Sequence, residues 1–290
     1  MIVATLRDIR RRINSVAKTQ QITKAMKMVA AAKLRRAQER VEKARPYAEG
    51  IADVLARVAA NVDVELNPFF QERETIRRVT YIVVSADRGF CGGFNSNIFK
   101  ETQHVIARDQ ADGIEVDIIA VGKKGADHFS RRKYPVSGAY KEFFKNLRFE
   151  DALEISKLVQ STFLNLETDA VKLIFSSAKS AIQTEIQVKQ CLPIQQADAN
   201  ENTNESEYLF EPGPVDMLNH LCPSAVNIQI WQALLESYAA EESARMVAME
   251  SATDAAQDMI DSLTLHYNKA RQAAITSEIS EIVGGAEALK

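Results

Sequence analysis

Glycine and proline are absent from two long stretches of this 290-residue chain. Neither residue occurs in the first 45 residues or from Ser224 to Val283, and both stretches are rich in Ala, Glu, Arg, Lys, Gln, Met and Leu. Because glycine and proline are the residues that most often interrupt or end helices, we expect a long helix at each end of the chain. At about 1.5 Å per residue, the two stretches would form helices of roughly 66 Å and 90 Å, and helices of such length need a partner along them.

Cysteine is also scarce, which excludes a disulfide framework. Cys91, Cys191 and Cys222 are widely spaced and form no CxxC pattern, so we expect a reducing compartment. The first residues lack the apolar core of a signal peptide, and no apolar run approaches the roughly 20 residues that span a bilayer. We therefore expect a soluble protein that can attach to a membrane complex.

The usual catalytic constellations are missing as well. The four histidines are isolated, and neither H-E-x-x-H nor G-x-S-x-G occurs. No pair of carboxylates is marked out by an apolar setting that would favour acid and base roles. We expect no catalysis by this chain alone, no cofactor and no metal.

Charge is distributed unevenly along the chain. Residues 1–57 hold 14 Lys and Arg against 5 Asp and Glu, whereas residues 226–290 hold 4 against 10, although the whole chain carries only −3. This asymmetry favours pairing of the two ends and leaves an excess of positive charge on the N-terminal helix. The alternative is two solvated helix faces with no partner beyond each other.

The two ends also carry the apolar spacing of a left-handed coiled coil, in which separations of three and four residues alternate. Many of these residues are small, so the seam buries little apolar area for its length and favours a thin rod that needs outside support. The N-terminal series, interrupted by Gln20 and Thr23, is Leu6, Ile9, Ile13, Val16, Met26, Ala30, Leu34, Ala37 and Val41. The C-terminal series is Met246, Met249, Thr253, Ala256, Ile260, Leu263, Tyr267, Ala270 and Ala274.

Between the ends, strand and helix signals alternate. Residues 79–84, 116–121 and 171–175 are typical of buried strands, and 182–188 alternates like a half-exposed edge strand. Helical segments separate the first three strands, starting near Asn95 and Lys124 and running from Asp151 to Leu166. This order predicts a parallel sheet in an α/β domain from about Arg77 to about Pro214.

A glycine-rich loop, Asp87 to Asn95, stands between the first strand and the following helix. Such loops bind phosphates in α/β folds, but this spacing matches neither G-x-G-x-x-G nor G-x-x-x-x-G-K-[ST]. The alternative is a tight structural turn in which Asp87 and Arg88 pair locally and Gly89, Gly92 and Gly93 supply positive φ. The segment from Gly122 to Gly125 is a weaker candidate of the same kind.

Three blocks of sequence resemble the gamma subunit of F-type ATP synthase. They run from Gln20 to Leu34, from Asp87 to Asn95 and from Tyr267 to Ile279, and shorter matches begin at Ala244 and Tyr208. The resemblance covers essentially the whole chain. The fold class that it implies is α/β, with a long antiparallel coiled coil of N- and C-terminal helices plus a central Rossmann-like α/β domain. We expect an N-terminal coiled-coil helix and connector in 1–76, the α/β domain in 77–214 and the C-terminal helix in 215–290.

The resemblance implies a central rotor shaft. The expected partners are three alpha and three beta subunits, an epsilon subunit and the c-ring of the membrane sector, with no nucleic acid. Proton-driven rotation of the c-ring would turn the shaft and change the conformation of each catalytic beta subunit. The expected location is the cytoplasmic face of a bacterial cell membrane, as a peripheral protein attached through the complex.

The resemblance also implies contact sites. The residues that match blocks facing beta subunits are Lys24, Met26, Arg245, Arg271, Gln272 and Thr276. For Met26 the simpler interpretation is a seam residue that fills a gap. Tyr208, Phe210 and Glu211 match a segment that contacts the c-ring or epsilon, or that merely packs as an edge strand on its own domain.

Some positions depart from the family pattern. Glu250 stands where relatives often carry lysine, while Ala86 and Phe90 stand where serine and leucine are frequent. The dithiol insertion of chloroplast relatives is absent, so we expect no redox switching.

A non-rotary coiled-coil scaffold would share the long ends, and a nucleotide-binding α/β enzyme would share the central domain.

Overall fold

The computed structural model describes residues 6–62, 67–178, 184–195 and 213–288. Its contacts form two compact units: the larger spans Ala31–Arg245, and the smaller combines Met1–Ala30 with Met246–Lys290. The elements in chain order are α1 (Leu6–Ala59), β1 (Arg78–Val84), α2 (Phe94–Ala111), β2 (Glu115–Val121), α3 (Lys123–Arg131), β3 (Val136–Tyr140), η2 (Phe143–Lys145), α4 (Phe149–Leu164), β4 (Ala170–Ala178), β5 (Thr184–Leu192) and α5 (Pro214–Ala288). Both α1 and α5 contribute residues to each unit.

The larger unit is built on a five-stranded sheet with the order β3-β2-β1-β4-β5. Strands β1, β2, β3 and β4 run parallel, whereas β5 pairs antiparallel with β4. The three predicted inner strands are confirmed, and so is the α/β class. The predicted edge strand is confirmed for 184–188, while its first two residues lie outside the described ranges.

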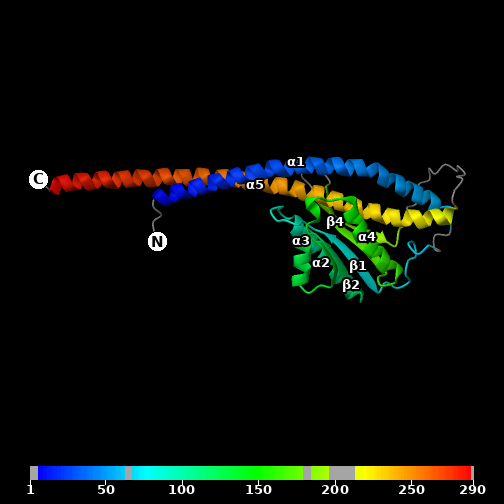
Figure 1. Ribbon diagram of the computed structural model, residues 1–290. Helices are drawn as coiled ribbons and strands as arrows, with labels where there is room; N and C mark the ends of the chain where they lie inside the picture. Colours follow the sequence, from blue (N-terminus) through cyan, green and yellow to red (C-terminus); the bar gives the residue numbers. More distant parts are fainter. Residues whose placement is uncertain (1–5, 63–66, 179–183, 196–212, 289–290) are drawn as a thin grey trace. The chain divides into compact units, whose positions relative to one another are not determined.

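Alternating side chains of the central strand β1 divide the core between the two faces of the sheet. Val79, Tyr81 and Val83 pack with α2 and α3, while Ile82 and Val84 pack with α4, the end of α1 and the first part of α5. Figure 1 shows this layering around the sheet. Burial on both faces explains why these strands are continuous apolar runs rather than alternating ones.

Strand β3 was not predicted from the sequence. Its residues, Val136 to Tyr140, include Ser, Gly and Ala, and none of the five is fully buried. A short edge strand of this composition carries little apolar signal, and it forms because the exposed edge of β2 offers backbone partners. The sheet is therefore wider than the predicted one.

Both long helices continue through residues that usually interrupt a helix. Helix α1 continues through Pro46 to Ala59, and α5 begins at Pro214 and continues through Pro223 and the Gly284-Gly285 pair. Proline suits the first helical position, where its missing N–H has no partner to lose. At Pro46 and Pro223 the helices continue because apolar residues on both sides, such as Leu55 and Val226, are buried in the core.

In the smaller unit the two helices pack side by side with opposite directions. Gln20 contacts Gln257, Thr23 contacts Thr253 and Lys27 contacts Glu250, so rising numbers on α1 meet falling numbers on α5. The predicted seam is confirmed: every one of its residues from Leu6 to Ala30 and from Met246 to Ala274 is buried or half-buried. None of the described helices has a segment long and apolar enough to cross a membrane.

Gly122, between β2 and α3, is the glycine that the fold requires most strictly. Its φ is 95°, and a Cβ atom there would lie 2.0 Å from the carbonyl oxygen of Ser85. We predict that Gly122→Ala lowers the free energy of unfolding by about 3 kcal/mol, because backbone strain adds to a clash with a backbone atom. Denaturant unfolding measures the change.

Gly50→Ala is the matched control. Gly50 lies inside α1, and a Cβ atom there meets nothing within 4 Å. The same substitution should stabilise the protein by up to about 1 kcal/mol, since alanine favours helix over glycine. Equal effects at the two positions would contradict the requirement for glycine at Gly122.

Candidate functional site

Asp87, just after β1, ties together three loops at the carboxyl edge of the sheet. Its carboxylate accepts hydrogen bonds from the backbone N–H groups of Lys123 and Glu142, each at 2.9 Å, and of Phe144 at 3.2 Å. These donors follow β2 and β3, so one side chain from the β1 loop fixes the positions of two neighbouring loops. The local pairing with Arg88 that we considered is replaced by these bonds, and Arg88 is exposed.

The rest of the turn uses fewer positive-φ glycines than expected. Gly92 has φ 55°, whereas Gly93 has φ −81° and caps α2. Phe90 takes the second left-handed position, with φ 61°, and its side chain is 76% exposed. The Asn95 side chain accepts a hydrogen bond from the Ala86 N–H at 3.0 Å and so closes the turn.

A buried cluster of charges on α5 lies near this turn, and sequence reasoning identified only its arginine. Arg245 donates to Glu241 at 2.5 Å and pairs with Glu242 at 2.8 Å, and all three side chains are buried. Lys33 of α1 is 3.5 Å from Glu242. The proposed partner contact Arg245 is thus held inside the protein by its own helix. In the sequence, the cluster is indicated only by two adjacent glutamates, Glu241 and Glu242, within an alanine-rich segment that has no glycine.

Burial sets the protonation of this cluster. Desolvation raises the pKa of Glu241 to about 7, although the Arg245 guanidinium opposes the change. Cys91, in the turn, also has a raised pKa, first through burial and then through the charge of Glu241. The cluster and the turn therefore share one electrostatic environment.

This arrangement disfavours a phosphate site at the glycine-rich loop. Ala240 of α5 packs in the same core as Cys91 and Phe94, so α5 covers the place where α/β proteins bind phosphates. The carboxylates of Asp87, Glu241 and Glu242 add negative charge there, which repels a phosphate. The loop acts as a structural turn between the sheet and α5.

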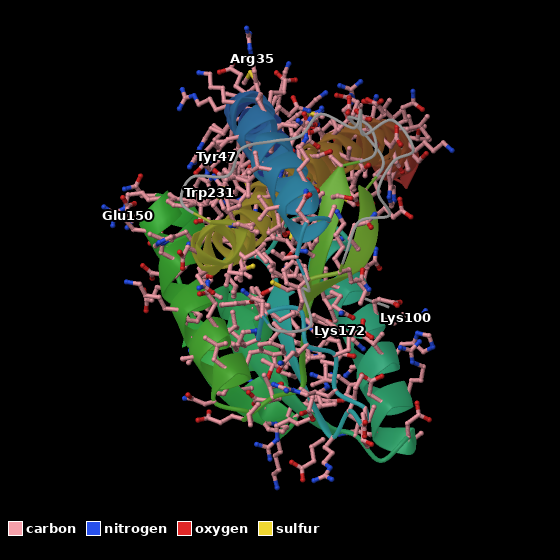
Figure 2. The ribbon with its side chains drawn as sticks, turned by 90° about the vertical axis from the view of Figure 1, so that its right-hand side faces the viewer. Arg35, Tyr47, Lys100, Glu150, Lys172 and Trp231 are labelled. Carbon is pink, nitrogen blue, oxygen red and sulfur yellow. The ribbon has the colours of Figure 1, made fainter. Side chains whose placement is uncertain are left out.

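Trp231 anchors α5 between α1 and α4, as Figure 2 shows. The guanidinium of Arg40 lies 5.4 Å from the ring centroid, and the Phe149 ring meets it edge-on at 5.7 Å. Arg40 also donates to the Leu147 carbonyl at 2.6 Å. These contacts hold the first part of α5 in place within the larger unit.

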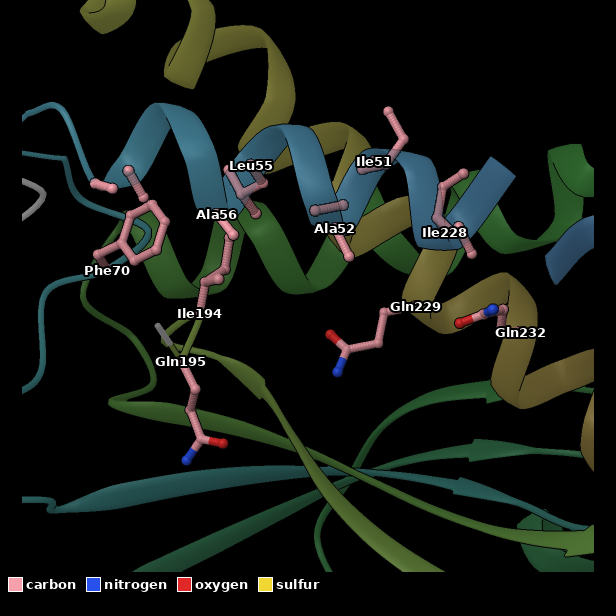
Figure 3. A pocket seen from close by; sticks show the side chains of 14 residues that line it. Ile51, Ala52, Leu55, Ala56, Phe70, Ile194, Gln195, Ile228, Gln229 and Gln232 are labelled. Carbon is pink, nitrogen blue, oxygen red and sulfur yellow. The ribbon is translucent and has the colours of Figure 1, made fainter. Parts of the chain in front are cut away.

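A cavity of about 500 Å³ lies between the end of α1, α5 and Ile194 (Figure 3). Its lining is mostly alanine and isoleucine with three glutamines, Gln195, Gln229 and Gln232, and includes no charged residue. The Gln229 amide is already bonded to the Gln190 carbonyl at 2.9 Å. The lining offers no nucleophile, acid or base for chemistry.

In the smaller unit, polar pairs occupy the middle of the helix seam. Gln20 donates to Gln257 at 2.9 Å and Thr253 to Thr23 at 2.8 Å, while Lys27 pairs with Glu250 at 2.6 Å. Of the predicted contact residues here, Lys24 is exposed and Met26 is half-buried. Lys24 thus presents its charge to solvent, whereas Met26 contributes to the seam. Glu250, at the position that departs from the family pattern, forms a charge contact with Lys27.

The remaining predicted contacts lie farther along α5. Arg271, Gln272 and Thr276 are exposed, and the Thr276 hydroxyl donates to the Gln272 carbonyl at 2.9 Å. At about 1.5 Å per residue they lie roughly 27–35 Å along the helix from Thr253, so Lys24 and Met26 are not at the same level. Tyr208, Phe210 and Glu211 lie outside the described residues.

Beyond Ala274, none of the described side chains of α5 is buried. Exposed apolar residues continue there at helical spacing: Ile275 is 47% exposed, Ile279 56% and Ile282 71%. An apolar stripe with no covering residue in the described chain marks a surface for a partner.

The cysteines and acidic residues supply no redox or metal centre in the described ranges. The three thiols are buried and free, and burial raises the pKa of Cys191 and Cys222 to about 12. No group of three or more His, Cys, Asp or Glu side chains in the described residues could hold a metal ion.

The fold and the exposed surfaces define a class of protein. It combines an α/β domain with two long terminal helices, and one of these helices carries an uncovered apolar stripe. A sequence model of the ATP synthase family matches residues 5–289. The ATP synthase gamma chains of Chlorobaculum parvum and Chlorobaculum tepidum are 48% and 47% identical, each over 99% of both chains. The chain therefore belongs to the ATP synthase gamma chain family.

Solved structures agree with this fold. A chain from the central stalk and c-ring structure of Tetrahymena thermophila mitochondrial ATP synthase is 25% identical with a TM-score of 0.60, over 80% of this chain and 99% of that one. A chain from the Euglena gracilis mitochondrial ATP synthase has a TM-score of 0.70 at 19% identity, over 98% and 94%. The second likeness shows the fold alone.

We predict that Asp87→Ala destabilises the larger unit by about 2–4 kcal/mol, because three backbone N–H groups lose their charged acceptor. Asp127→Ala is the control, since Asp127 makes only a partly exposed ion pair with Lys141 at 3.5 Å and should cost about 1 kcal/mol or less. Chemical unfolding compares the two variants. Equal losses would mean that the Asp87 bonds do not hold the loops.

We also predict that Lys27→Glu lowers the free energy of unfolding by about 1 kcal/mol, because it places two carboxylates together. The double variant K27E/E250K should restore most of that loss, since it rebuilds the pair with opposite polarity. A double-mutant cycle measures the coupling. A coupling of zero would show that the contact is not energetically significant.

Proposed function

We propose that this chain is the central rotor shaft of an F-type ATP synthase, turning with the c-ring and changing the conformation of the catalytic beta subunits in succession. The chain itself is then non-catalytic, and ATP synthesis or hydrolysis takes place on beta. Membership of the gamma chain family and the fold shared with a central stalk support this role.

The observation that carries the proposal is the uncovered end of α5. Three isoleucines from Ile275 to Ile282 form an exposed apolar stripe with no cover from the described residues. Removing such a stripe from water gains roughly 25 cal/mol per Å². A sleeve of three alpha and three beta subunits around the helix end supplies that cover.

A shaft also needs contacts that differ from side to side. Lys24, Arg271, Gln272 and Thr276 are exposed on the paired helices, and Met26 stands at the seam. Rotation brings such groups to each beta subunit in turn, and only a difference in contact energy between beta conformers shifts their populations. We assign Arg245 to the same contacts, with the qualification that its guanidinium is already paired with Glu241 and Glu242.

The remaining parts of the proposal concern the membrane side. We assign Tyr208, Phe210 and Glu211 to contacts with the c-ring or epsilon. We place the complex at the cytoplasmic face of a bacterial membrane, with this chain as a peripheral subunit.

The division into a helix and connector (1–76), an α/β domain (77–214) and a C-terminal helix (215–290) is part of the same proposal. A non-rotary coiled-coil scaffold is not favoured, because whole-chain relatives are ATP synthase gamma chains.

The test is ATP hydrolysis by purified alpha and beta subunits with and without this chain. We predict that the full chain joins with one copy per three alpha and beta pairs and changes turnover. Ile279→Asp should weaken association by about tenfold or more, because a charge would replace an apolar side chain that the surrounding subunits cover.

Ser280→Asp is the matched control, since it adds the same charge one residue away from the apolar stripe. It should bind nearly as well as the unchanged chain. A chain ending at Ala274 should lose the effect on turnover. If the full chain assembles but turnover does not respond to it or to the truncation, the scaffold alternative replaces the rotor.

A further inference from the structure

We propose that Glu241, Glu242 and Arg245 of α5 form a binding site for one exchangeable proton, and that this proton determines how firmly α5 is held against the Asp87 turn. The proposal concerns the larger unit alone and does not depend on the rotor assignment. It rests on two buried carboxylates that share one guanidinium.

The cluster places two carboxylates on one guanidinium in a buried setting. Glu241 is 4% exposed and Glu242 2%, and each has one oxygen bonded to Arg245. The other oxygen of Glu242, Oε2, is buried and has no hydrogen-bond partner among the described residues. A buried acceptor without a donor costs about 1–3 kcal/mol, so the cluster holds more acceptor oxygens than Arg245 can satisfy.

Charged groups of both signs from the neighbouring elements also surround the cluster. From α1, Lys33 lies 3.5 Å from Glu242, and the charge of Arg40 acts on Tyr238, whose pKa it lowers against the larger effect of burial. From the turn, Asp87 adds a negative charge and Cys91 a buried thiol. Tyr238 lies on α5 itself. Asp87, Glu241 and Glu242 thus face two close cations, Arg245 and Lys33, and one proton would balance the charges.

Glu241 is the residue that would hold the proton. Burial raises its pKa from the ordinary 4.5 to about 7, with smaller upward contributions from Glu242 and Asp87, while Arg245 lowers it. The direction agrees with the geometry, because charging a second buried carboxylate beside a single close guanidinium is unfavourable. The proton would therefore exchange near neutral pH.

The effect on stability has a definite sign. The folded state binds this proton up to about pH 7, whereas the unfolded chain releases it near pH 4.5. The stabilisation is therefore complete below pH 4.5 and is lost as pH rises through 7. From pH 5 to pH 8 the unfolding equilibrium constant should rise by up to about 70-fold through this group alone.

Infrared difference spectroscopy of the full-length chain tests the proton directly. Lowering the pH from 8 to 6 should produce a protonated-carboxyl band with a midpoint near 7, and Glu241→Gln should abolish it. Glu278→Gln, on an exposed turn of the same helix, should leave the band unchanged. The wild-type chain by itself decides the matter: if no carboxyl group titrates above pH 6, the proposal fails, even if E241Q does not fold.

Unfolding measured across the same pH range tests the consequence. The wild-type chain and E278Q should lose stability from pH 5 to pH 8. For E241Q the rise in the unfolding equilibrium constant should be smaller by up to about 70-fold, because glutamine mimics the protonated acid. Parallel pH profiles for E241Q and wild type would show that the proton does not act on the attachment of α5.

Discussion

The larger unit depends on the burial of the first part of α5 against one face of the sheet. Leu218, Cys222, Val226, Ile230 and Leu234 recur every four residues and are almost fully buried, in one core with β1, β2 and β4. The same face of the sheet takes α4 and the end of α1. Without the first part of α5, a portion of this apolar face would be exposed to water, so the sheet depends on the helix for its stability.

That constraint explains why the helix continues where its sequence favours a break. Pro223 removes a backbone hydrogen bond in the middle of the buried segment, at a cost of about 3 kcal/mol in an isolated helix. The buried side chains on either side of it each contribute roughly 1.5–3 kcal/mol, which is enough to maintain the helix. Pro46 in α1 lies close in sequence to buried Ala48 and Leu55, and the same argument applies.

The turn at the carboxyl edge of the sheet packs against α5. In many α/β proteins that edge receives a phosphate, but here Asp87 binds three backbone N–H groups and α5 packs against the turn. The same packing buries two carboxylates beside Arg245. An attachment built from charges is open to control by protonation, whereas one built from apolar contacts alone is not.

Periodicity and composition determined much of this protein from the sequence: the class, the inner strands, the helices between them and the seam of the paired helices. These succeed because repeating apolar residues report which face of an element is buried. The sequence did not reveal β3, the continuation of α1 through Pro46 to Ala59, or the glutamates that hold Arg245. Those features were decided by tertiary structure, because a weak edge strand, a helix across proline and a buried ion pair each depend on neighbours distant in sequence.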